Sequence, residues 1–82
     1  MNLELYQEIA LTRNLPEYQL QQGDIATLID FVPHPTGGEI GCILEVFNAI
    51  GESIKVVTVP RTAIKKLTSH DILSSRQLIE ST

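Results

Sequence analysis

The side chains best suited to bind a metal ion stand in the middle of the sequence. His34, Glu39 and Cys42 offer an imidazole, a carboxylate and a thiol, and the second histidine, His70, lies far along the chain. A structural zinc site normally takes four ligands, mostly cysteine and histidine at tight spacing, and this chain has one cysteine. We therefore expect no metal ion or other cofactor, and we expect Cys42 to be a small buried residue on a strand.

No arrangement of side chains points to catalysis. No serine lies in a nucleophile-elbow sequence, and nothing suggests a catalytic triad. The pair Gly37-Gly38 followed by Glu39 looks like a phosphate-binding turn, but neither a helix N-terminus nor a P-loop lysine follows it. We interpret this stretch as a loop and predict that the protein is not an enzyme.

A basic cluster near the end of the chain would suit a phosphate backbone. It consists of Arg61, Lys65 and Lys66. The net charge of −4 and the pI near 4.9 oppose binding to nucleic acid, because that binding needs an excess of basic residues on one face. We favour lysines that protect an edge strand from pairing with other chains. A nucleic-acid-binding barrel of the SH3-like or KOW-like type is the alternative function.

Charges are unevenly distributed along the chain. Residues 1–52 hold eight acidic residues against Arg13, whereas residues 53–82 hold five basic residues against Asp71 and Glu80. This asymmetry indicates a bipolar surface that docks on a charged partner or on a second copy of the chain. Alternatively, early and late strands interleave in the fold, and the asymmetry disappears in space.

Short runs rich in Ile, Val and Leu alternate with Gly and Pro, which is typical of strands and turns. We predict five strands, at residues 7–12, 23–32, 40–48, 53–59 and 64–67. The apolar residues of the first segment are also compatible with one face of a helix. A chain of 82 residues supports a single core. We expect a mostly β domain over residues 1–67 and a tail over residues 68–82 that is a frayed helix or disordered.

The spacing of several residues resembles the bacterial DUF4926 family over about residues 5–67. The residues that carry this resemblance are Leu15-Pro16-Glu17, Leu20, Gly23-Asp24, Thr27, Gly51 in the turn of a hairpin, Val57-Thr58-Val59-Pro60 and Leu67. The resemblance implies a small five-stranded SH3-like barrel and no assigned activity. The chain departs from the family pattern at Ala26, where a glycine is common, and in a longer loop over residues 33–39.

The hairpin over residues 40–59 has apolar residues on both faces. We expect one set to point inward, namely Cys42, Leu44, Val46, Ile54 and Val56. The opposite parity then presents an outward set that is our candidate partner-binding site, namely Ile43, Phe47, Val57 and Val59. An apolar second face is normally covered, by the tail (Ile72, Leu73, Leu78), by the N-terminal segment (Leu3, Leu5) or by another protein. A bulge would reverse the assignment.

These observations predict a small binding module that contacts another protein or a second copy of itself. The acidic composition suits a basic partner, as for an antitoxin or immunity protein that covers a basic enzyme. The sequence has neither the pattern of a signal peptide nor a stretch of about 20 apolar residues. We expect a bacterial cytoplasmic protein that does not bind membranes.

Overall fold

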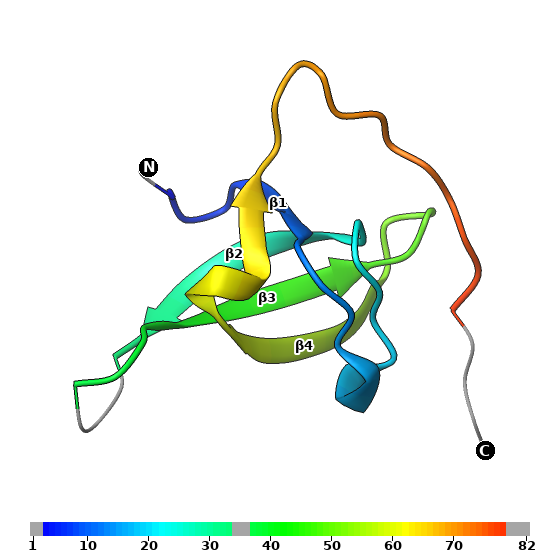
Figure 1. Cartoon of the computed structure of the whole chain (residues 1–82). Coiled ribbons are helices and arrows are strands. Elements are labelled where there is room, and N and C mark those ends of the chain that lie inside the picture. The colour runs from blue at the N-terminus through cyan, green and yellow to red at the C-terminus, as the bar shows by residue number, and fades with distance from the viewer. Residues whose placement is uncertain (1–2, 34–36, 79–82) are drawn as a thin grey trace.

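The computed structural model describes residues 3–33 and 37–78 (Figure 1). It contains five strands: β1 (Glu8–Leu11), β2 (Ile25–Val32), β3 (Gly41–Phe47), β4 (Ser53–Pro60) and β5 (Ile64–Lys66). Two short 3₁₀ helices complete the elements: η1 (Pro16–Tyr18) and η2 (Arg61–Ala63). Each strand begins and ends within two residues of its predicted bounds, so the predicted strands are confirmed.

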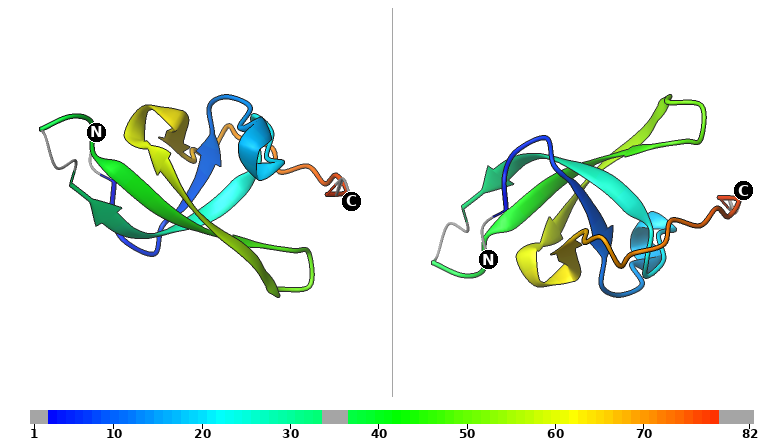
Figure 2. Two further views of the ribbon diagram at one scale, coloured as in Figure 1. Left: turned by 90° about the horizontal axis from the view of Figure 1, so that it is seen from below. Right: turned by 90° about the horizontal axis from the view of Figure 1, so that it is seen from above.

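All five strands belong to one antiparallel sheet in the order β4-β3-β2-β1-β5. The sheet bends so that the short strands β1 and β5 lie across the longer strands (Figure 2). The edge strands β4 and β5 are joined through η2 but are not hydrogen-bonded to each other. The predicted mostly β class is therefore confirmed, although the sheet is open and is a barrel only in a loose sense.

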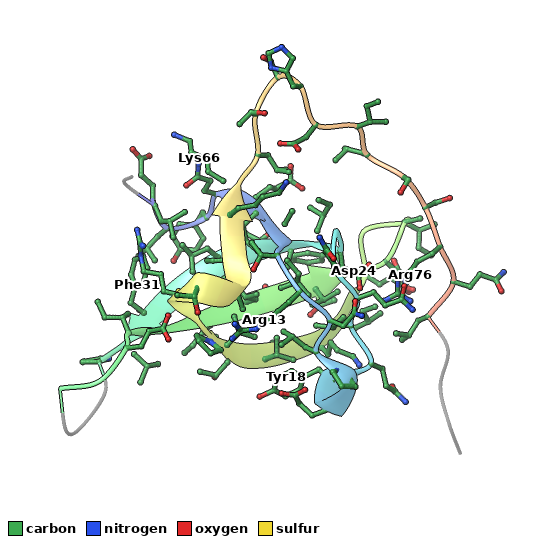
Figure 3. All side chains as sticks on the ribbon, in the orientation of Figure 1. Arg13, Tyr18, Asp24, Phe31, Lys66 and Arg76 are labelled. Carbon is green, nitrogen blue, oxygen red and sulfur yellow. The ribbon has the colours of Figure 1, made fainter. Side chains whose placement is uncertain are left out.

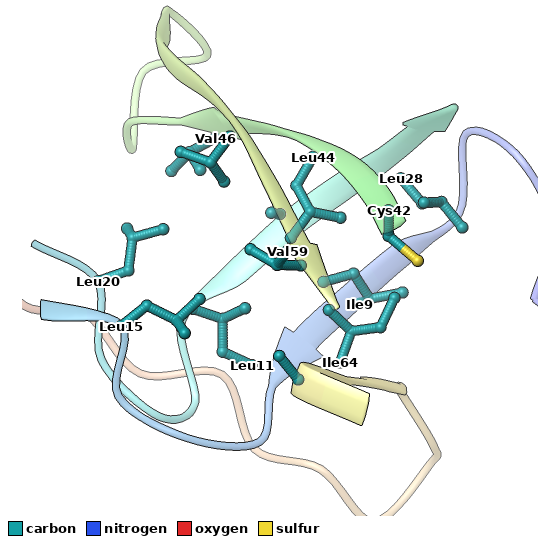
Figure 4. Packing of buried hydrophobic residues seen from close by; sticks show 13 residues of the cluster. Ile9, Leu11, Leu15, Leu20, Leu28, Cys42, Leu44, Val46, Val59 and Ile64 are labelled. Atoms are coloured by element: carbon teal, nitrogen blue, oxygen red, sulfur yellow. The ribbon is translucent and has the colours of Figure 1, made fainter. Parts of the chain in front are cut away.

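The core lies inside this bend. Every second residue of β3 is buried, from Cys42 through Leu44 to Val46, as the alternation of a strand requires. These side chains face Ile9 of β1 and Ile64 of β5 across the core (Figure 4). The prediction that Cys42 is a buried strand residue is thus confirmed.

The long connection between β1 and β2 closes one end of the core and protects the free edge of β4. Pro16 begins η1, where its fixed φ and missing N–H are tolerated. The Tyr18 hydroxyl donates a hydrogen bond of 3.0 Å to the Thr58 carbonyl on β4. In return, the Lys55 ammonium donates a hydrogen bond of 2.7 Å to the Tyr18 carbonyl. Two reciprocal contacts therefore hold η1 against the edge strand.

Removal of the Tyr18 hydroxyl tests this contact. We expect Tyr18→Phe to lower the free energy of unfolding by about 1 kcal/mol, because the hydrogen bond to Thr58 is lost while the ring stays in place. Tyr6→Phe is the matched control, since Tyr6 is exposed and should change stability by less than about 0.5 kcal/mol. Urea denaturation measures both values. Equal midpoints for the two variants would contradict the proposed protection of β4.

Beyond β5 the tail makes a turn at Ser69-His70 and has no helix or strand over residues 67–78, so the helical alternative is wrong for this stretch. Ile72 is 92% exposed and Leu73 is also exposed, because neither side chain reaches the sheet. Within the described residues, no helix has the length and apolar character that crossing a bilayer would require.

Candidate binding surface at the hairpin end

The structure divides the predicted outward set of the β3–β4 hairpin. Ile43 is partly exposed and Phe47 is exposed, as predicted. Val57 and Val59 are instead core residues, only 5% and 1% exposed. The predicted outward orientation of these two valines is wrong, and the four residues do not form one patch.

A β-bulge explains this error. Phe47 pairs with Ser53 beside the turn, and this register would place Leu44 opposite Val56 if it continued. The register shifts between Val46 and Phe47, however, so that Leu44 pairs with Val57. One extra residue in β4 reverses the face of every residue that follows.

The bulge turns a different apolar set outward at the end of the hairpin. Val56, assigned inward from the sequence, is 58% exposed, and Ile54 is also exposed. Ile54 lies near Phe47, because both line the crevice described below, and Val56 follows two residues later in β4, opposite Glu45. We call Phe47, Ile54 and Val56 the hairpin surface. The tail residues Ile72 and Leu73 do not cover it, since both are exposed themselves.

Acidic side chains share the outer face of the sheet with this surface. Direct cross-strand pairing places Glu8, Thr27, Glu45 and Val56 in one row from β1 to β4, and paired residues point to the same face. Among the described residues, the salt bridges are Lys65–Asp71 and Arg76–Asp24. Neither carboxylate of the row has a basic partner there, and Lys65, which shares this face through its pairing with Ala10, is joined to Asp71.

A crevice of about 290 Å³ opens beside the hairpin surface. It lies between the hairpin end, the start of β2 and the tail, and its apolar lining residues are Leu20, Ile25, Val46, Phe47, Ala49, Ile54 and Leu78. Leu20 and Val46 also belong to the core cluster. The crevice therefore reaches from the exposed hairpin surface down to the buried end of the core.

One ion pair forms the polar wall of this crevice (Figure 3). The Arg76 guanidinium donates two hydrogen bonds to the Asp24 carboxylate, from Nε to Oδ1 at 2.8 Å and from Nη2 to Oδ2. Nη2 also donates to the Gln19 carbonyl at 3.3 Å. A bidentate pair of this kind is more specific in geometry than a single-point contact.

The local turn and a backbone hydrogen bond hold the Asp24 carboxylate in position for Arg76. Asp24 ends the turn Gln21–Asp24, whose third residue, Gly23, has a φ of +91° that suits glycine. The carboxylate also accepts a 2.8 Å hydrogen bond from the Gln21 N–H. Burial acts to raise the pKa of Asp24, but the hydrogen bonds from Arg76 and Gln21 outweigh it and lower that pKa below the ordinary 3.8. The ion pair therefore contributes its full stability above the ordinary pKa of 3.8. This stability is lost as the pH falls through the lowered pKa of the folded state.

The suggested metal ligands do not form a site in the part of the chain that the structure describes. His34 lies outside the described residues, and no group of three His, Cys, Asp or Glu side chains converges within them. The Glu39 carboxylate accepts a 2.8 Å hydrogen bond from the Thr62 N–H, which lowers its pKa. Burial raises the pKa of the Cys42 thiol, so the thiol is held in its neutral, weakly ligating form.

Two features of this surface escaped the sequence analysis. Val56 was assigned to the wrong face because no pattern in the turn announced the bulge. Asp24 was noticed only as part of the Gly-Asp pair, and its partner Arg76 lies 52 residues further along. No local spacing connects residues so far apart.

Comparison with known proteins gives one match. The family model described as "Domain of unknown function (DUF4926)" matches residues 5–66, which include all five strands but not the tail. No curated protein and no solved structure is significantly similar to the chain.

Proposed function

Because the chain belongs to the DUF4926 family, which has no assigned activity, we propose a function from the surface alone: it is a small module that binds another protein. The hairpin surface carries this proposal. Val56, Ile54 and Phe47 are all exposed on the hairpin, and Ile54 and Phe47 lie beside a crevice with a largely apolar lining. A contiguous apolar surface beside a hollow is typical of protein interfaces.

The charges beside the hairpin surface favour a basic partner. Glu8 and Glu45 lie in the row that ends at Val56, and neither has a basic partner among the described residues. Facing copies of this face would repel each other, and a phosphate backbone would be repelled in the same way. These charges support a different protein as partner, rather than a second copy or a nucleic acid.

An inhibitory role of the antitoxin or immunity type would fit this chemistry, since such a protein covers the active site of a basic enzyme. A bacterial cytoplasm suits the unpaired thiol of Cys42, because free thiols persist in a reducing compartment.

Affinity purification of the full chain from its native host tests the proposal. We expect one protein partner in stoichiometric amount, with Val56→Asp reducing its recovery at least tenfold, because a charge replaces an apolar contact at the interface. Ile72→Asp is the matched control: it places the same charge on an exposed aliphatic residue of the tail and should leave recovery unchanged. Equal recovery by wild type and Val56→Asp, or recovery of nucleic acid alone, would contradict the proposal.

A further inference from the structure

The tail lies against the crevice as an extended segment. Ser74, Ser75, Arg76 and Leu78 form one of its walls, with no strand or helix in this stretch. Leu78 is partly buried, whereas Ile72 and Leu73 just before this wall are exposed. The tail therefore contacts the domain chiefly through Arg76 and the apolar residue two positions later.

A single strong contact holds this segment in place. The bidentate Arg76–Asp24 pair is partly shielded from water, with 28% and 20% of the two side chains exposed. The other anchor, between Lys65 and Asp71, is a 3.6 Å ion pair with a half-exposed lysine, and such surface pairs contribute little. Loss of Arg76 would therefore release the segment while the sheet stays intact.

The groove beneath the segment has a defined chemistry. Its floor is apolar, formed by Leu20, Ile25 and Val46, and Phe47 and Ile54 at its rim belong to the hairpin surface. Its polar end is the Asp24 carboxylate, which needs a cation because a shielded carboxylate without one is costly. An occupant of this groove must supply one cation and one apolar side chain.

On the basis of the proposed function, we propose that residues 74–78 lie along one side of this groove as an internal pseudo-ligand and that a segment of the protein partner replaces them. The replacing segment is extended, places an arginine or lysine on Asp24 and places an apolar side chain two residues later against the crevice. The remainder of the partner then contacts the hairpin surface. This requirement for a cation agrees with the negative charge of the neighbouring sheet face.

The tail of a second copy could offer the same two side chains, but two effects oppose it. The chain's own tail competes at the high effective concentration that a tether provides. Each copy also carries a net charge of −4, which disfavours association of the copies with each other. A foreign segment can add contacts with the hairpin surface that this tail does not make.

An NMR titration of the full chain tests the replacement, with a synthetic peptide of residues 71–78 as the probe. We expect the peptide to shift the amide signals of Asp24, Ile25 and Ile54 in the Arg76→Ala protein. Its dissociation constant should be at least tenfold lower than for wild type, because the groove of this variant is open. A peptide with alanine in place of its arginine should bind at least tenfold more weakly. Arg13→Ala, which removes an exposed arginine elsewhere, should behave as wild type.

Backbone ¹⁵N relaxation supplies a second measurement. The order parameters of residues 74–78 should fall in Arg76→Ala, and Arg76→Lys should restore part of the order because the charge is kept. Unchanged order parameters in Arg76→Ala, failure of its groove to bind the peptide, or formation of a dimer by this variant would each overturn the pseudo-ligand. None of these results would affect capture of a partner through Val56, so the proposed function is tested separately.

Discussion

Val57→Asp should unfold the domain, whereas Val56→Asp should leave it folded. Val57 is buried opposite Leu44 in the core, and an unpaired buried carboxylate costs several kcal/mol. A domain of this size has only about 5–10 kcal/mol of stability in total. Val56 points outward beside Glu45, so its aspartate stays hydrated and costs about 1 kcal/mol through repulsion by a like charge.

Circular dichroism and the dispersion of amide proton shifts distinguish the two variants. Each variant is the control for the other, because neighbouring valines of β4 receive the same substitution. The opposite result, with Val56→Asp unfolded and Val57→Asp folded, would show that β4 has no bulge and that the register of the turn continues along the hairpin.

Leu44→Ala should lower the free energy of unfolding by about 3 kcal/mol. Leu44 is fully buried at the centre of β3, and truncation there removes apolar contacts and leaves a cavity that the surrounding strands fill only in part. Urea denaturation should show a much lower midpoint with an unchanged slope.

Leu73→Ala provides the control for this loss. The same atoms are removed from an exposed residue of the tail, so the free energy of unfolding should change by less than about 0.5 kcal/mol. A large loss at Leu73 would mean that the tail packs on the domain far more than its exposure indicates, and a small loss at Leu44 would mean that the core lies elsewhere.

The positions of the strands were predictable because their signals are local. Pro16 favours a turn before β2, the prolines and glycines over residues 33–38 favour a loop that connects β2 to β3, and Asn48 with Gly51 indicates the hairpin turn. In the structure the Asn48 side chain accepts hydrogen bonds from the N–H groups of Ile50 and Glu52. Backbone restriction and turn chemistry act within a few residues, so one sequence is enough to locate them.

The faces of the strands were predictable only where the register is continuous. β3 alternates without interruption from Cys42 to Val46, and its buried side was identified correctly. β4 contains a bulge at Ile54, and a single extra residue there depends on how the twisted strands meet the core rather than on a local signal. The candidate surface was therefore placed on the correct hairpin, but Val57 and Val59 of β4 were assigned to it in place of Ile54 and Val56.

The contacts of the tail depend on tertiary structure in the same way. Arg76 meets Asp24 only after β1 and β5 have paired and brought the tail back across the start of β2. The fold also brings together charges that are far apart in the sequence: the acidic Asp24 of the first part pairs with the basic Arg76 of the second.

Burial shields the thiol of Cys42, the chain's single cysteine, from oxidants and alkylating agents in the native protein. Its sulfur lies in the core and is kept protonated by its surroundings, so a reagent can attack it only when β3 leaves the sheet. Each covalent adduct then records one opening event and prevents the strand from returning, since the enlarged side chain no longer fits. Oxidative damage to this protein would accordingly accumulate in proportion to the time that each molecule spends unfolded, and the damaged molecules would be those already open to proteolysis.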